Sequence, residues 1–145
     1  MLILQTILYA VFIVSIAVVL HELGHIIMIL AINAGEIKKV VARIRPFAIG
    51  IMWEPHSHMK NNWFARGLVS SGGIIGNILG FAVSLIALFG LSVPIFFEIA
   101  FCNLFYFSVN LFSRNSLADG KKIKKYFSAF IEEETAFKTM QIKYK

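Results

Sequence analysis

Lysine and arginine are absent from the first 37 residues of the chain and again between Arg66 and Arg114. Six of the 14 lie between Lys38 and Arg66, and the other eight follow Phe112. The net charge of +6 therefore forms no basic stripe with interleaved aromatic residues, which excludes a nucleic-acid interface. Because both basic clusters flank apolar runs, a lipid bilayer with an anionic face is the simpler partner.

Charge of either sign is scarce, and so is cysteine. Charged residues make up 15% of the 145 residues, against 58% hydrophobic residues. A soluble domain of this size could not bury so much apolar surface, so the composition indicates a protein solvated by lipid. The single cysteine, Cys102, rules out a disulfide within the chain and is interpreted as a small residue of the membrane core.

Three long apolar runs predict three transmembrane helices, from Leu2 to about Ile32, from about Trp63 to Gly90 and from about Val93 to Phe112. At 1.5 Å per residue, the first run is longer than a hydrocarbon core of about 30 Å. The N-terminal run lacks the basic cluster of a secretory signal, so it is interpreted as a retained helix. Pro94 marks a tight turn, which makes the second and third helices an antiparallel pair.

The two basic regions predict the orientation of the chain. By the positive-inside tendency both face the cytoplasm, which puts the N-terminus outside and the C-terminus inside. We expect an integral protein of a prokaryotic cell membrane, because the predicted core is so small.

The connection between the first two helices has a different pattern. Residues Ile37 to Arg45 and Phe47 to Trp53 are rich in valine, isoleucine and aromatic residues, which predicts two short strands. An exposed edge of this hairpin could pair with an extended substrate, or the hairpin could be purely structural. Asn61 and Asn62 could cap the second helix.

The tail from Ala118 onward predicts an amphipathic helix. Its apolar residues recur at helical spacing beside four lysines, Lys121, Lys122, Lys124 and Lys125. Such a helix could lie on an anionic membrane or pack on its own protein. The predicted fold class is thus an all-α membrane protein of three transmembrane helices, with a short β-hairpin (36–59) and a C-terminal amphipathic helix. Residues 1–117 form the core domain, and residues 118–145 form the metal-ligand turn and basic tail.

The sequence at residues 21–25, His-Glu-Leu-Gly-His, carries the chemistry. On a helix, His21 and His25 lie one above the other and can hold one Zn²⁺. Glu22 lies beside the metal, where it can take a proton from the attacking water and pass it to the leaving amine. Ionisable residues in an apolar span are costly, so a functional site is favoured over a polar cluster between helices.

A catalytic zinc ion usually has a third protein ligand. Four acidic residues are candidates: Glu36, Glu54, Glu98 and Asp119. Asp119 is preferred, because it follows the third helix at the same membrane face that the first helix reaches after His25. It could instead be a simple turn residue before Gly120.

With these residues the chain resembles the site-2 protease family of intramembrane zinc metalloproteases. The resemblance covers roughly residues 10–122 and implies His21, His25 and Asp119 as zinc ligands and Glu22 as the base. Gly73-Ile-Ile-Gly-Asn77 is similar to the family's Gly-Pro-x-x-Asn segment, with Ile74 in place of proline. The resemblance implies that Asn77, with Gly73, contacts the substrate backbone or the oxyanion, whereas a helix–helix hydrogen bond is the alternative.

The chain departs from the family just before the acidic ligand. Many members have a proline-rich sequence and Leu-Asp-Gly there, where this chain has Ser113, Arg114 and Ala118-Asp119-Gly120. A small-residue stripe in the second helix should pack against the first or third helix rather than form a dimer seam; its members are Gly72, Gly76, Gly80 and Ser84. His56 and His58 are a weaker candidate for a second metal site.

The function predicted on these grounds is that of a zinc-dependent endopeptidase. It would cut a peptide bond in or near a transmembrane segment or a membrane-associated peptide, and a regulatory membrane partner could assist selection. Two alternatives are a metal-binding or metal-transporting membrane protein and a catalytically inactive scaffold related to site-2 proteases. Transport would require polar residues spread along the span, and the intact His21, Glu22 and His25 favour activity over a scaffold.

Overall fold

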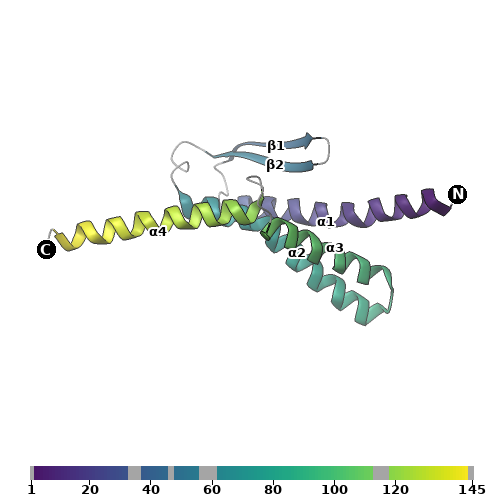
Figure 1. Ribbon diagram of the computed structural model, residues 1–145. Helices are drawn as coiled ribbons and strands as arrows, with labels where there is room; N and C mark the ends of the chain where they lie inside the picture. Colours follow the sequence, from purple (N-terminus) through teal and green to yellow (C-terminus); the bar gives the residue numbers. More distant parts are fainter. Residues whose placement is uncertain (1, 33–36, 46–47, 56–61, 113–117, 144–145) are drawn as a thin grey trace.

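Four helices and one hairpin make up the part of the chain that the computed structural model describes, which is residues 2–32, 37–45, 48–55, 62–112 and 118–143. In chain order the elements are α1 (Leu2–Ile32), β1 (Ile37–Arg45), β2 (Ala48–Pro55), α2 (Trp63–Leu91), α3 (Ile95–Phe112) and α4 (Asp119–Lys143). Figure 1 shows α2 and α3 as an antiparallel pair crossed by α1, with α4 on the other side of α2.

The three predicted spans are confirmed as helices long and apolar enough to cross a membrane, with 31, 29 and 18 residues for α1, α2 and α3. The exposed surface of α1 is apolar nearly throughout, and its buried residues form a narrow stripe at helical spacing: Ile13, Ala17, His21, Gly24 and Ile29. A helix surrounded by lipid needs no polar face, because its backbone groups are hydrogen-bonded within the helix. The composition therefore fits a membrane protein.

The ends of α2 follow from local chemistry. At its start the side chain of Asn62 accepts a hydrogen bond from the Ala65 backbone N–H at 2.9 Å, which confirms the predicted cap at that residue. Asn61 lies outside the described residues. At its other end Ser92 has a φ of 54°, and its N–H donates to the Leu88 carbonyl at 2.8 Å. This left-handed cap stops the helix, and α3 begins directly after Pro94.

Helices α1 and α2 are in direct backbone contact inside the bundle. A Cβ on Gly24 would lie 2.0 Å from the Gly72 carbonyl oxygen, and one on Gly76 would lie 2.3 Å from the Leu20 carbonyl oxygen. Only glycine permits so close an approach. The predicted internal packing of the small-residue stripe is confirmed.

The label all-α needs correction, because the described residues contain, beside the helices, a two-stranded antiparallel sheet of β1 and β2 in the connection where two strands were expected. The strand β2 runs to Pro55, two residues beyond the expected end at Trp53, whereas Phe47 lies outside the described residues. A proline restricts the residue before it to the extended region, so Glu54 continues the strand up to Pro55. The sheet pairs Arg45 with Ala48 at its closed end, and β2 contacts α1.

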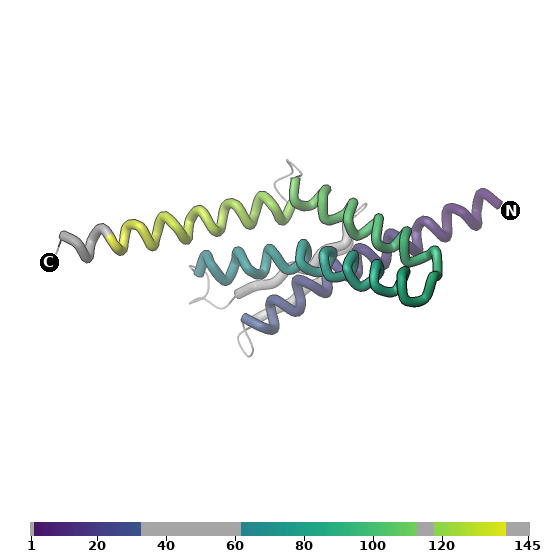
Figure 2. The backbone as a smooth tube through the Cα atoms, turned by 90° about the horizontal axis from the view of Figure 1, so that it is seen from below, coloured from purple at the N-terminus to yellow at the C-terminus, as the bar shows by residue number. Residues whose placement is uncertain are grey.

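Helix α4 has two different halves. Its first turns pack on the beginning of α2, where the ring of Phe127 lies against Gly67 and the ring of Phe130 lies 5.3 Å from that of Phe64. Of the two predicted settings for this helix, packing on its own protein is the one found here. Beyond Phe130 the described side chains are exposed or half-exposed, and in both views α4 extends away from the other helices (Figures 1 and 2).

Candidate metal centre

Three side chains from two distant helices meet at one point inside the bundle. The Asp119 Oδ2 atom lies 2.9 Å from His21 Nε2 and 3.1 Å from His25 Nε2. All three ligand atoms lie within 4.8 Å of one another, which is close enough to hold one metal ion. His21 and Asp119 are buried, at 4% and 3% exposed. The structure thus brings together the three predicted ligands.

The hydrogen bonds of Asn77 determine how His21 is protonated. The Asn77 Nδ2 group donates to the Ala17 carbonyl and to Asn103 Oδ1, both at 3.0 Å. A backbone carbonyl can only accept, so the amide is oriented with its Oδ1 towards His21 Nδ1, 2.7 Å away. His21 Nδ1 is therefore the donor, and the lone pair of a neutral imidazole lies on Nε2.

His25 is oriented in the same way by the backbone of α2. Its Nδ1 atom lies 2.8 Å from the Val69 carbonyl oxygen, to which it must donate. The lone pair of the neutral ring again lies on Nε2, which faces Asp119. Ligand histidines in metal sites usually donate their other N–H in this way, which fixes both the tautomer and the ring orientation.

Asp119 supplies negative charge to this point. Burial alone would raise the pKa of its carboxyl, but hydrogen bonds with His21 and His25 and the positive charges beside it lower that pKa far below its ordinary value. One of those charges is Lys122, whose Nζ lies 3.0 Å from Asp119 Oδ1. The carboxylate is thus ionised at neutral pH. A carboxylate facing two imidazole lone pairs is held together only by a proton or a cation between them.

The walls of the centre lie close against the two imidazoles. A Cβ on Gly73 would lie 2.4 Å from His21 Nε2 and 2.6 Å from His25 Nε2, so a side chain here would displace both ligands. On the α3 side, the Tyr106 ring meets the His21 ring edge to face, with centroids 5.1 Å apart. Gly73 therefore serves the metal ligands directly, a role that the family resemblance did not imply.

Glu22 is half-buried and follows His21 on α1. Its carboxylate interacts electrostatically with His25 and with Tyr106, which places it at the edge of the ligand cluster. Asn77, the other residue with a predicted substrate role, is fully buried. Its amide bonds to His21, Ala17 and Asn103 as described, so the interhelical hydrogen bond is the interpretation that the structure favours.

An aromatic clamp on α2 positions the helix that carries Asp119. The Arg66 guanidinium lies 5.4 Å from the centroid of the Trp63 ring and 4.7 Å from that of the Tyr126 ring. Its Nη2 also donates to the Tyr126 hydroxyl at 3.2 Å. Because Asp119 is the first residue of α4, this clamp and the Phe127 contact hold the third ligand in place.

Other predicted residues lie elsewhere. Glu98 bonds to Tyr9 in the opposite half of the bundle, far along α3 from the metal centre. Glu36, His56 and His58 lie outside the described residues, and so do Ser113 and Arg114. Asn103 forms an interhelical hydrogen bond with Asn77, whereas the amide of Asn110 donates to the Tyr106 carbonyl of its own helix.

Sequence reasoning missed Tyr106, Lys122 and the Arg66 clamp. Only Lys122 had a local signal, since it follows Asp119 by three residues on a helix and so lies on the same face. Comparisons with protein-family models, with curated proteins and with solved structures found no match. The resemblance to site-2 proteases therefore depends on the motif residues alone.

Proposed function

We propose that the protein is a zinc-dependent intramembrane endopeptidase of the site-2 protease type. The observation that carries this proposal is the convergence of His21 Nε2, His25 Nε2 and Asp119 Oδ2 in a bundle of apolar helices, with Glu22 beside them. Three acceptor atoms that face one another need a proton or a cation between them, and one metal ion would satisfy all three.

Zinc is the metal that best fits these donors. Two imidazoles and one carboxylate are a ligand set that Zn²⁺ accepts, and three protein ligands leave a coordination position open, as in catalytic zinc sites. Harder ions such as Mg²⁺ and Ca²⁺ prefer oxygen donors. The hydrogen bonds from the Nδ1 atoms to Asn77 and Val69 pre-orient both rings, which lowers the cost of binding the ion.

The residues of the chain have distinct roles in the proposed hydrolysis. Bound zinc would supply a Lewis acid that polarises the scissile carbonyl and makes a water molecule more acidic. Glu22 takes the proton of the attacking water and delivers it to the leaving amine. Asp119 and the two histidines keep the centre in place, and Tyr106 covers His21 on the α3 side.

The substrate class follows from the location of the centre. A peptide that reaches these residues must enter between membrane helices, so the substrates are transmembrane segments or membrane-associated peptides. We place the N-terminus outside, the C-terminus in the cytoplasm and the centre towards the cytoplasmic side, because both basic regions lie at that end. At about 1.5 Å per residue, His25 lies about 10 Å before the end of α1.

The decisive variant is Glu22→Gln. Because Glu22 is not among the three ligands, the purified variant should keep one zinc ion per chain and lose cleavage of membrane peptides by at least about 100-fold, the usual contribution of a general base. Zinc is measured by atomic emission and cleavage by mass spectrometry in vesicles. Normal turnover by the variant would contradict the proposed role of Glu22 as the general base. Stoichiometric zinc in a wild-type protein that cuts no membrane peptide would support a metal-binding protein or an inactive scaffold instead.

A further inference from the structure

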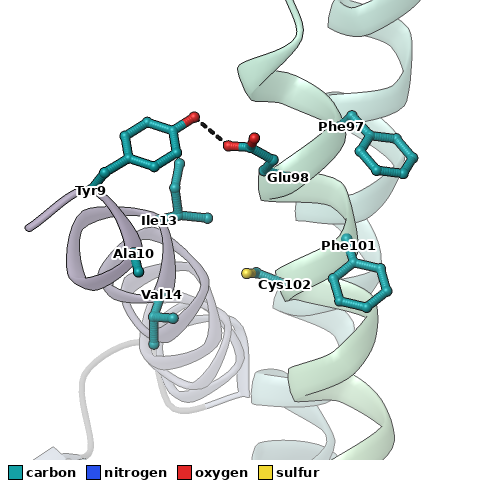
Figure 3. Close-up of a pocket in the computed structure, with 8 residues that line it drawn as sticks. All are labelled: Tyr9, Ala10, Ile13, Val14, Phe97, Glu98, Phe101 and Cys102. Carbon is teal, nitrogen blue, oxygen red and sulfur yellow. Dashed lines mark hydrogen bonds between the residues drawn. The ribbon is translucent and has the colours of Figure 1, made fainter. Parts of the chain in front are cut away.

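A groove lies between α1 and α3 in the half of the bundle away from the metal centre. We call it the outer groove; it has a volume of about 270 Å³ and is lined by Tyr9, Ala10, Ile13, Val14, Phe97, Glu98, Phe101 and Cys102. In Figure 3 the Cys102 thiol points towards α1, and Glu98 and Tyr9 face each other across the groove. It opens to the surroundings of the helices, since several of these residues, Tyr9, Val14 and Phe101 among them, are exposed.

Glu98 is an unbalanced charge in this region. Its carboxylate accepts a hydrogen bond from the Tyr9 hydroxyl, which is neutral. Neither α1 nor α3 contains a lysine or an arginine, and the whole of residues 1–37 and 67–113 lacks them. Glu98 is exposed in the first turn of α3, near the outer end of that span, so its charge is available to an incoming ligand. None of the described lysine and arginine side chains lies beside Glu98, so a cationic group from another molecule can pair with it.

The outer groove leads towards the metal centre along the same two helices. One turn inward from Ile13 is Ala17, whose carbonyl holds Asn77, and the next turn brings His21. On α3, Cys102 adjoins Asn103 and lies one turn before Tyr106. Along α1 the ligand cluster therefore lies about 12 Å further in than the groove, a distance set by the rise of the helix.

We propose that the outer groove docks the substrate peptide through a lysine or arginine at the peptide's outer end, which pairs with Glu98, and through an apolar side chain in the cavity. This inference rests on the proposed function and adds a substrate class to it: membrane peptides with a basic residue near the outer surface. A long basic side chain suits the position, because its apolar stem can lie along Tyr9 while its charge reaches Glu98 (Figure 3). A lipid with an amine headgroup could also pair with Glu98, but pairing of a lipid would have no connection with the metal ligands, whereas a substrate peptide must reach them.

The single native cysteine provides a direct test. Glu22→Gln protein is placed in phosphatidylcholine–phosphatidylglycerol vesicles with a single-span peptide that carries a lysine at its outer end and one cysteine four residues further in. Because Cys102 follows Glu98 by one helical turn, copper-phenanthroline oxidation should join Cys102 to the peptide cysteine. The yield should fall about fivefold when the peptide lysine is replaced by glutamine, or when the protein carries Glu98→Gln, the size expected of an exposed ion pair.

Two controls separate docking from chance collision. In Cys102→Ser/Phe89→Cys protein the thiol lies on α2 at a residue 81% exposed, and the yield there should not depend on the peptide lysine. With Glu98→Lys protein, a peptide with glutamate in place of lysine should crosslink better than the lysine peptide. Equal yields at Cys102 for lysine, glutamine and glutamate peptides would overturn the proposal. A competing lipid would also overturn the proposal: added phosphatidylethanolamine would abolish the peptide crosslink in protein that keeps Glu98, but not in the Glu98→Gln variant.

The design keeps the two proposals distinguishable. Crosslinking uses the Glu22→Gln protein and requires no cleavage, so a lysine-dependent crosslink combined with no cleavage by wild-type protein would contradict only the endopeptidase function. If lysine and glutamine peptides were cleaved at equal rates and also gave equal crosslinking yields at Cys102, only the proposed docking through Glu98 would be contradicted.

Discussion

The contact between α1 and α2 differs from the seam between α1 and α3, although the same helix takes part in both. At Gly24 and Gly72 the backbones of α1 and α2 touch, and no side chain separates them. Near Tyr9 and Glu98 the helices α1 and α3 are kept apart by side chains, and the outer groove lies between them. The ligands of a metal ion need positions held to a fraction of an ångström, whereas a docking surface must admit different occupants.

The hydrogen bonds of the two regions differ in burial. Around His21 a buried chain of hydrogen bonds runs from Asn103 through Asn77 to the imidazole. In the outer groove one hydrogen bond joins two exposed residues, Tyr9 and Glu98. Substitutions near the metal should therefore act on metal binding, and substitutions in the groove should act on substrate choice alone.

The largest effect is expected from Gly73→Ala. The new methyl group would lie within 2.6 Å of both histidine Nε2 atoms, so the rings must move and the ligand geometry is lost. Zinc content by atomic emission should fall to a small fraction of one per chain. The matched control is Gly90→Ala, since a Cβ at Gly90 meets nothing within 4 Å. Full zinc occupancy in Gly73→Ala would show that the imidazoles have more freedom than the contact with α2 implies.

A smaller loss is expected when the hydrogen bond to His21 is removed. Asn77→Leu leaves the imidazole in place but without its acceptor, which should weaken zinc binding by about 10- to 100-fold. Competition with a fluorescent chelator gives the dissociation constant, and circular dichroism checks that the helices persist. Asn110→Leu removes an amide that bonds only to its own helix and should change the affinity little. Equal losses in both variants would contradict an orienting role for Asn77.

The clamp on α4 should produce the smallest of these effects. Arg66→Met keeps an unbranched stem but removes the cation between the Trp63 and Tyr126 rings, while Phe127 and Phe130 still hold α4 on α2. We expect about a fivefold weaker affinity for zinc, because the loss of two partly exposed cation–π contacts reaches Asp119 only indirectly, through α4. Lys138→Met, at an exposed position further along α4, is the control. Unchanged affinity in Arg66→Met would show that the apolar contacts alone position Asp119.

Much of this arrangement could be predicted from residue type and spacing. Long apolar runs predict membrane helices because lipid imposes their length, and two histidines one turn apart share a face in any α-helix. Asp119 could be predicted as the third ligand because its segment returns to the same membrane face. These inferences depend only on the chain's own geometry and on its solvent.

Other features could not be predicted because they arise from contacts between distant segments. Gly73 serves the imidazoles only because α2 approaches α1 so closely, and Asn77 meets His21 only in that packing. The clamp of Arg66 requires α4 to run back along α2. The end of β2 was missed for a local reason, since a strand pattern was stopped at Trp53 although Pro55 favours an extended Glu54.

The origin of the ligands has a consequence for how the protein is made. Both histidines belong to α1, which enters the membrane first, and Asp119 belongs to α4, which is synthesised last of the four helices. During translation the growing chain therefore holds an incomplete centre, with two ligands and no carboxylate. The proposed protease would therefore gain its catalytic site only after its own membrane helices are in place, which would protect both the nascent chain and its neighbours in the insertion machinery from premature cleavage.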